Sequence, residues 1–215
     1  SQGLSPHGIK PIKYFKKNDI ILLTAVTRNN KNKDKINILN KVGLVVNYPL
    51  EDEYEILIRT IGPICGFELI NKIFEKKDTE LKSYYEVPNE FIKNSYSMQS
   101  ITIIIDYPLN VYCQNLRYKF IEGAFIKTVN LIDELSFAHG YYQNTELWNS
   151  SFILINNKND KIKNILKNKN LYEINSDNIV EIEHILNILI LKLVKYGSIN
   201  QKAWPGKNTQ KYIYN

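Results

Sequence analysis

The first third of the chain carries three short apolar runs of the kind that form β-strands. Residues 20–27 are a partly β-branched run that follows a turn signal at Asn18. Residues 42–48 and 54–61 are two further runs, and the five residues between them, beginning with Pro49, suit a hairpin loop. Together the three runs predict an N-terminal antiparallel β-meander or small barrel.

Two other segments have the apolar spacing of helices. Residues 66–77 follow a Gly-Pro pair that we expect to end the third strand, and their apolar side chains recur on one helical face. Residues 178–196 have the clearest helical pattern, because Ser176 or Asp177 can cap their start and Gly197 follows their end. The second half of this segment is apolar on nearly every side, which predicts a long buried C-terminal helix.

The middle of the chain mixes both patterns. Apolar runs at residues 101–107 and 151–156 predict strands, and the alternation of residues 112–122 predicts a half-buried strand. Residues 161–167 resemble a short Lys-rich helix, whereas residues 124–135 fit either a helix or a strand. The whole pattern predicts an α+β fold in which the long C-terminal helix packs on the sheet.

No sharply defined linker divides the chain. We expect one α+β domain over residues 14–197, with a weak boundary near 78–88. Residues 1–13 and 198–215 are expected to be an N-terminal and a C-terminal arm. The arm residues expected to bind a partner are Pro6, Pro11, Trp204, Tyr212 and Tyr214.

Composition accounts for much of the positive charge. The 215 residues include 27 Asn, 25 Lys, 32 Ile, 15 Tyr and three Arg, and the formal net charge is +6. Asn, Lys, Ile and Tyr have A/T-rich codons, so the bias points to an A/T-rich genome more than to a task. Nucleic-acid-binding proteins depend on Arg for bidentate contacts, and we therefore expect the Lys-rich, basic surface to serve solubility first.

Arrangements of catalytic residues are scarce. The chain has no glycine-rich phosphate-binding loop and no nucleophile elbow. Glu181 and His184 share a helical face, but no second such pair completes a metal site, so we predict neither a metal nor a cofactor. Cys65 and His139 could form a thiol–imidazole couple. Nothing in the sequence brings them together, and no catalytic residue is predicted.

The same features bear on location. No apolar run reaches the length of a membrane span, and the two cysteines are too few and too far apart for a disulfide framework. We expect an intracellular protein in a reducing compartment, either the cytoplasm or an organellar matrix.

The leading hypothesis is a non-catalytic structural or interaction subunit of a larger protein or ribonucleoprotein assembly, docked on other subunits through its arms. One alternative is a nucleic-acid-binding module that uses Lys side chains and stacked aromatic rings. A second alternative is a small hydrolase or transferase that uses Cys65 and His139. The candidate stacking residues are Tyr14, Tyr112, Tyr118, Tyr141 and Tyr142.

Overall fold

The computed structural model describes residues 12, 14–24, 37–47, 61–74, 81, 85–105, 109–141, 143 and 149–199. Contacts between residues divide the chain into two compact units. Unit 1 consists of Ser1–Glu55, Ile61–Asp78 and Trp204–Asn215, and unit 2 consists of Ile56–Thr60 and Thr79–Ala203.

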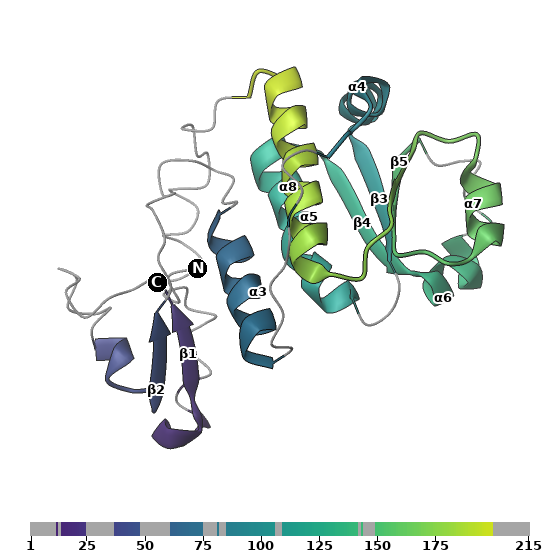
Figure 1. Ribbon diagram of the computed structural model, residues 1–215. Coiled ribbons are helices and arrows are strands. Elements are labelled where there is room, and N and C mark those ends of the chain that lie inside the picture. The colour runs from purple at the N-terminus through teal and green to yellow at the C-terminus, as the bar shows by residue number, and fades with distance from the viewer. Residues whose placement is uncertain are drawn as a thin grey trace. The chain divides into compact units, whose positions relative to one another are not determined.

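Unit 1 contains two short strands that pair in parallel (Figure 1). Its described elements are the 3₁₀ turn η2 (Lys17–Asp19), β1 (Ile21–Thr24), β2 (Leu44–Asn47) and the helix α3 (Ile61–Phe74). Ile21 lies opposite Leu44 in the register of the two strands. At the other end of the pair, Asn47 Nδ2 donates a hydrogen bond to the Thr24 carbonyl at 3.1 Å.

The predicted antiparallel meander, or small barrel, is wrong, although strands do form within residues 20–27 and 42–48. Apolar alternation identifies a strand but not the direction in which it pairs, and the β1–β2 connection is long enough for a parallel crossover. Of the third predicted strand, residues 54–60 lie outside the described residues. Ile61 begins α3, so the Gly-Pro pair starts a helix, where proline's missing N–H removes no intrahelical bond.

The helix predicted over residues 66–77 is present but begins five residues earlier, as α3. Its predicted apolar face is only partly covered. Phe67 and Ile70 are half-buried, whereas Ile73 and Phe74 are exposed.

Unit 2 is built on a four-stranded parallel sheet with the strand order β4–β3–β5–β6. Ile105 of β3 lies opposite Asp133 of β4 and Ile155 of β5. The described elements of unit 2 are α4 (Asn89–Met98), β3 (Ser100–Ile105), α5 (Asn110–Ala124), β4 (Thr128–Asp133), α6 (Glu134–Ser136), the π-helical turn η3 (Phe137–Tyr141), β5 (Ser151–Ile155), α7 (Asp160–Leu166), β6 (Leu171–Ile174) and α8 (Ile179–Tyr196).

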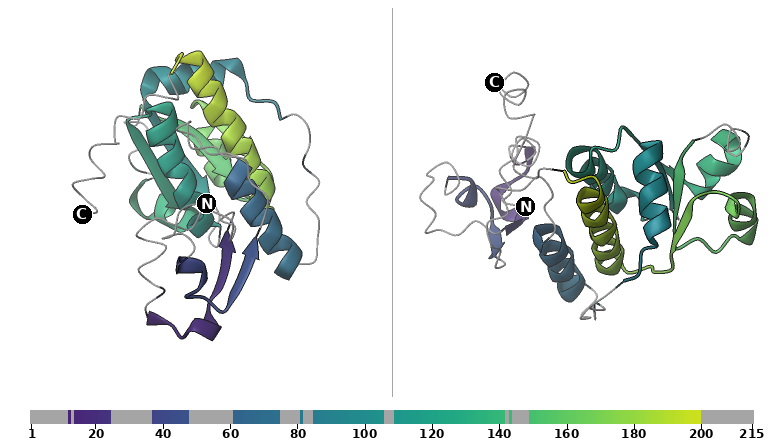
Figure 2. Two further views of the ribbon diagram at one scale, coloured as in Figure 1. Left: turned by 90° about the vertical axis from the view of Figure 1, so that its left-hand side faces the viewer. Right: turned by 90° about the horizontal axis from the view of Figure 1, so that it is seen from above.

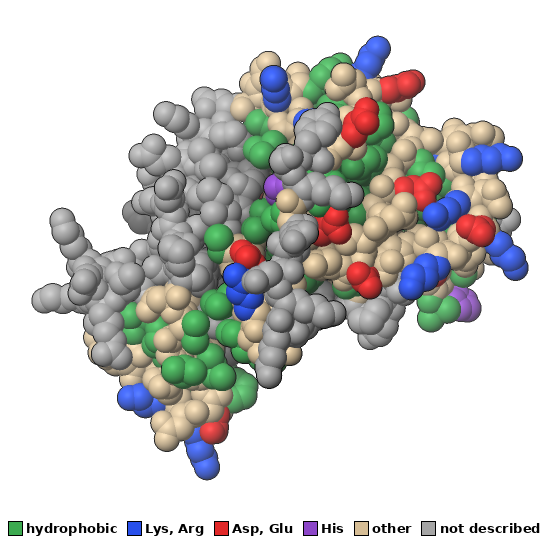
Figure 3. All heavy atoms as spheres, in the orientation of Figure 1, with side chains coloured by type: hydrophobic (Ala, Val, Ile, Leu, Met, Phe, Trp, Pro, Cys, Tyr) green, Lys and Arg blue, Asp and Glu red, His purple; other side chains and the backbone are tan. Residues whose placement is uncertain are grey.

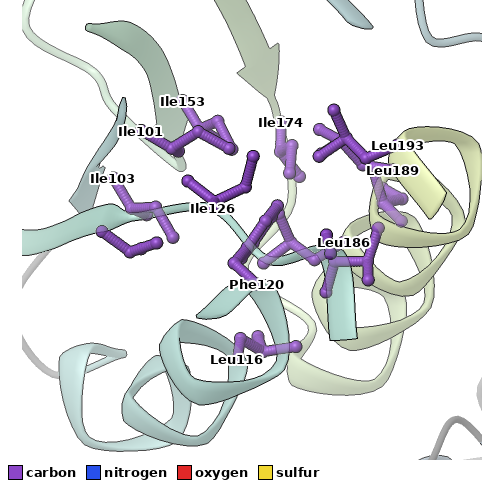
Figure 4. Packing of buried hydrophobic residues seen from close by; sticks show 14 of the residues in the cluster. Ile101, Ile103, Leu116, Phe120, Ile126, Ile153, Ile174, Leu186, Leu189 and Leu193 are labelled. Atoms are coloured by element: carbon purple, nitrogen blue, oxygen red, sulfur yellow. The ribbon is translucent and has the colours of Figure 1, made fainter. Parts of the chain in front are cut away.

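Helices cover both faces of this sheet (Figures 1 and 2). On one face α4, α5 and α8 enclose the larger core, which Figure 4 shows between strand isoleucines and helix leucines. On the other face α7 and η3 enclose a smaller core. Coverage on both sides explains why β5 is buried along its whole length and reads as a continuous apolar run. The smaller core consists of Ile104, Ile132, Phe137, Phe152, Leu154, Ile162 and Leu166.

The strand predicted over residues 112–122 is wrong, because this segment forms α5. Cys113, Leu116 and Phe120 are buried at helical spacing, while Tyr118 is 55% exposed. The apparent alternation came from reading an exposed tyrosine as a core residue. Residues 124–135, which fitted either state, contain β4. Neither α4 nor β6 was predicted.

The other predicted elements of unit 2 are confirmed. β3 begins one residue before the strand predicted over 101–107, β5 lies within 151–156, and both ends of α7 fall within one residue of the predicted helix. The long buried C-terminal helix is α8. Its cap is Asn178 rather than Ser176 or Asp177, since the Asn178 side chain accepts hydrogen bonds from two backbone amides of the first turn.

Candidate functional site

The four parallel strands of the unit 2 sheet all end at the same edge, here called the carboxyl edge. The connections that leave this edge run in opposite directions across the sheet. β3 connects through α5 to β4 on one side, and β5 connects through α7 to β6 on the other. Because α5 and α7 cover opposite faces, the connections diverge between β3 and β5. Ligands of doubly wound sheets bind outside the carboxyl ends of the strands at such a switch point. The candidate site is this place, the carboxyl edge between β3 and β5.

A turn rich in asparagine follows β5 at the carboxyl edge. Asn156 adopts a left-handed conformation (φ 51°), and its N–H donates to the carbonyl of Ile174 at 2.8 Å. Asn157 is 5% exposed, and its Oδ1 accepts the N–H of Asn159 at 2.8 Å. Asn159 in turn caps α7 by accepting the N–H of Lys161 at 3.0 Å. The turn is thus held by its own side chains.

One polar atom of this turn is left over. Asn157 Nδ2 is buried and has no hydrogen-bond partner in the part of the chain that the structure describes. Its carboxamide is fixed by the bond that Oδ1 makes to Asn159. Buried side-chain donors in folded proteins nearly always have a partner, so an exception calls for an explanation.

Asp133 ends β4 at the same edge. Its Oδ1 accepts the backbone N–H of Ser136 at 2.6 Å and so caps α6. This hydrogen bond holds the pKa of the Asp133 carboxyl below its ordinary value, against a smaller opposing effect of burial. The carboxyl edge therefore carries a fixed negative charge on the β4 side.

His139 follows Asp133 in the π-helical turn η3. Gly140 next to it has φ 146°, which a residue with a side chain rarely adopts. His139 itself is exposed. Single π-helical turns are frequent at functional sites, but among the described residues no side chain is seen to orient the His139 imidazole by a hydrogen bond.

The β6 side of the edge is closed by polar contacts within the protein. Glu181 Oε1 accepts the Tyr85 hydroxyl at 2.7 Å, and Oε2 accepts the Ser176 hydroxyl at 2.6 Å. The ring of His184 meets the ring of Tyr85 edge-on, with 5.6 Å between centroids. Because both carboxylate oxygens are engaged, the Glu181–His184 pair serves to dock the segment before α4 on α8.

A second polar network lies at the opposite, amino edge of the sheet. Asn170 Nδ2 donates to Ser151 Oγ at 2.6 Å, and Ser150 Oγ lies 3.0 Å from Thr102 Oγ1. These side chains tie β3, β5 and the start of β6 together. Their hydrogen bonds are made within the protein, so we assign them to the fold.

A buried ionic contact joins α5 to α8. Lys119 Nζ donates to Glu183 Oε1 and, at 2.9 Å, to Asn187 Oδ1. Asn187 Nδ2 also donates to Glu183 Oε1 at 3.2 Å. Lys119 is 9% exposed and Glu183 is 1% exposed. Burial, assisted by the nearby Glu183 charge, raises the pKa of the Cys113 thiol to about 12.

The residues singled out from the sequence are scattered. Cys65 lies half-buried on α3 of unit 1 and His139 lies in unit 2, so the Cys65–His139 couple stays a prediction. Tyr14, Tyr118 and Tyr141 are exposed. The residues that lie outside the described part, or whose side chains do, are Pro6, Pro11, Tyr112, Tyr142, Trp204, Tyr212 and Tyr214.

Asn157, Lys119 and Glu183 were not identified from the sequence. Asn157 follows an apolar run, which is a usable signal for the carboxyl end of a strand. In a chain with 27 Asn, however, that signal is lost among many others. The buried lysine was hidden because residues 112–122 were assigned the wrong periodicity.

No protein-family model and no curated protein matches the chain. Across the described residues, no group of three or more His, Cys, Asp or Glu side chains is placed to hold a metal ion. None of the helices described is both long enough and apolar enough to span a membrane.

Proposed function

We propose that unit 2 binds a small polar molecule at the carboxyl edge between β3 and β5. The observation that carries this proposal is the buried Nδ2 of Asn157, which has no partner among the described residues. Burying such a donor without a hydrogen bond costs about 1–3 kcal/mol of folding free energy. An oxygen acceptor on a ligand would satisfy it, at the place where doubly wound sheets bind their ligands.

The groups around Asn157 favour a ligand with several hydrogen-bonding oxygens. Asn156 and Asn159 border the same turn, and neither carries a charge. Asp133 on the β4 side can accept hydrogen bonds from ligand hydroxyls or amines. Amide groups after β5 and a carboxylate at the end of β4, on the other side of β3, suit a small hydroxylated or amino-bearing molecule better than an apolar one.

Thermal denaturation in the presence of small molecules tests this proposal. The panel contains amino acids, dicarboxylates, sugars, nucleosides and the phosphate esters of both. Asn157→Asp is the sharpest variant, because it keeps the Oδ1 acceptor for Asn159 and removes the Nδ2 donor. Asn164→Asp makes the same change at an exposed position on α7 and serves as its control.

We expect at least one compound to raise the Tm of the wild-type chain. Asn157→Asp should weaken its binding by about tenfold or more, which corresponds to about 1.4 kcal/mol. Asn164→Asp should bind as the wild type does. If a compound raises the Tm of Asn157→Asp as much as that of the wild type, its binding site lies elsewhere. If no compound in the panel raises the Tm of the wild type, the result counts against a binding function.

A second candidate function is that of an assembly subunit docked through its terminal arms. Leu191 and Tyr196, near the end of α8, are exposed large hydrophobic residues just before the C-terminal arm. Such side chains suit a protein interface. Removing residues 200–215 should then abolish co-purification with partner subunits while the Tm of the remaining chain is unchanged. Full incorporation of the shortened chain would contradict this function.

The nucleic-acid alternative has less support. Tyr118 is exposed on α5, but acidic and basic side chains are interspersed on the face of the molecule shown in Figure 3. Lys163, for example, pairs with Glu173 at 2.8 Å. A phosphate-binding surface would gather one sign of charge.

A further inference from the structure

Among the side chains that the structure describes, the core between α5 and α8 is apolar apart from the contact of Lys119 with Glu183 and Asn187. The buried face of α8 presents similar branched side chains on its successive turns. When core residues are replaced by other apolar residues of similar total volume, a protein loses its single packing arrangement before it loses stability. A buried polar contact can therefore specify the axial position of α5 on α8 more sharply than aliphatic packing alone. The α8 residues of this core are Ile182, Ile185, Leu186, Leu189, Ile190, Leu193 and Val194.

The contact of Lys119 with α8 favours one axial position of α5 over positions displaced by one helical turn. Lys119 lies between Glu183 and Asn187, which are one helical turn apart. A displacement by one turn would bring Lys119 between Ile179 and Glu183, or between Asn187 and Leu191. The first displacement separates the ammonium from Asn187. The second separates it from Glu183, and separating two buried opposite charges is strongly disfavoured.

The same contact is poorly designed as a source of stability. Glu183 Oε2 is buried without a hydrogen-bond partner among the described residues. A buried ion pair also loses the hydration of both charges, so apolar residues of similar volume often stabilise a protein as well or better. What the contact supplies is a preference for one arrangement.

We propose that Lys119, Glu183 and Asn187, here called the α5–α8 clamp, fix the axial position of α5 on α8. α5 begins at Asn110, after β3 and at the carboxyl edge. The clamp therefore also sets where the first turn of α5 lies at the candidate site. This second consequence rests on the proposed function, whereas the first does not.

Hydrogen–deuterium exchange of the full chain tests the clamp without any ligand. The test variant replaces the clamp by apolar residues, as Lys119→Met, Glu183→Leu and Asn187→Leu together. Leu189→Met changes an apolar residue of the same interface and is the control. The readout is the exchange rate of α5 amides relative to β3 amides, together with urea unfolding of each variant.

We expect the apolar variant to resist urea at least as well as the wild type, while its α5 amides exchange about tenfold faster relative to β3. Unchanged relative exchange would overturn the proposal, because packing alone would then hold α5. If the triple variant does not fold, Glu183→Gln decides, since it keeps the side-chain shape and removes the charge. Faster α5 exchange in that variant supports the clamp, and unchanged exchange refutes it.

Discussion

Gly197 lies against the ring of Tyr96, so that a Cβ at position 197 would come within 2.4 Å of Tyr96 Cε2. Gly197 has φ −79°, a value open to any residue, and the missing Cβ therefore matters for space and not for backbone freedom. The Tyr96 ring also meets the Tyr196 ring edge-on, with 5.5 Å between centroids. These contacts join the end of α8 to α4.

Gly197→Ala should destabilise the protein by about 1–3 kcal/mol, the usual cost of forcing extra atoms into a packed contact. Urea unfolding measures the change. In a Tyr96→Ala background the same substitution should cost less than about 0.5 kcal/mol, because the obstructing ring is gone. An equal cost in both backgrounds would show that the ring is not the cause.

Lys119→Met should destabilise the protein by about 3–5 kcal/mol, because it leaves Glu183 charged and buried without its cation. Lys163→Met breaks the partly exposed Lys163–Glu173 pair and should cost less than about 1 kcal/mol. Urea unfolding at neutral pH compares the two. Similar costs for both lysines would mean that Lys119 is solvated.

Cys113 should make stability fall in alkaline solution. Its pKa rises from 9.0 to about 12 on folding, so the unfolded chain releases the thiol proton first. The contribution is fully present below pH 9 and is lost as pH rises from 9 towards 12. Urea unfolding between pH 8 and about pH 11 should show a steeper decline for the wild type than for Cys113→Ala. Burial also raises the pKa of Tyr172, but this affects the wild type and Cys113→Ala equally. If the stabilities of the two proteins decline in parallel with pH, the prediction is contradicted.

Asp133 should give the opposite dependence in acid. The Ser136 N–H lowers the pKa of the Asp133 carboxyl below 3.8 on folding, so its contribution is present above pH 3.8 and is lost as pH falls through the lower value. Asp133→Asn keeps a capping acceptor without titrating there. The stability of the wild type relative to Asp133→Asn should therefore fall in acid, and a constant difference would contradict this. Asp133→Ala should cost about 1 kcal/mol at neutral pH.

The sequence correctly predicts elements whose hydrophobic pattern is local, such as a fully buried apolar run or a helix with a clear start and end. The apolar stretch of β5 and the capped α8 were both located, because their signals are local. Pairing direction was not, since a strand such as β1 has the same alternation whether its partner runs parallel or antiparallel. The helix α5 was misread because exposed Tyr118 looks like a core residue.

The candidate site was beyond the sequence for a different reason. The carboxyl edge can be located only when the strands are known to be parallel and their order in the sheet is known. Asn157 differs from the other asparagines because its Nδ2 is buried with no partner among the described residues, and the burial of one asparagine among 27 is a tertiary property. The same holds for Lys119, whose partners lie 64 and 68 positions away on α8.

The most direct test of ligand binding at the carboxyl edge is an NMR titration of the ¹⁵N-labelled chain with the compound that raises the Tm most. We predict that the largest chemical-shift changes fall at Leu109, Asn110 and residues 156–159, and that they include the side-chain amide of Asn157. A compound that binds while these signals stay unchanged would contradict the proposed site.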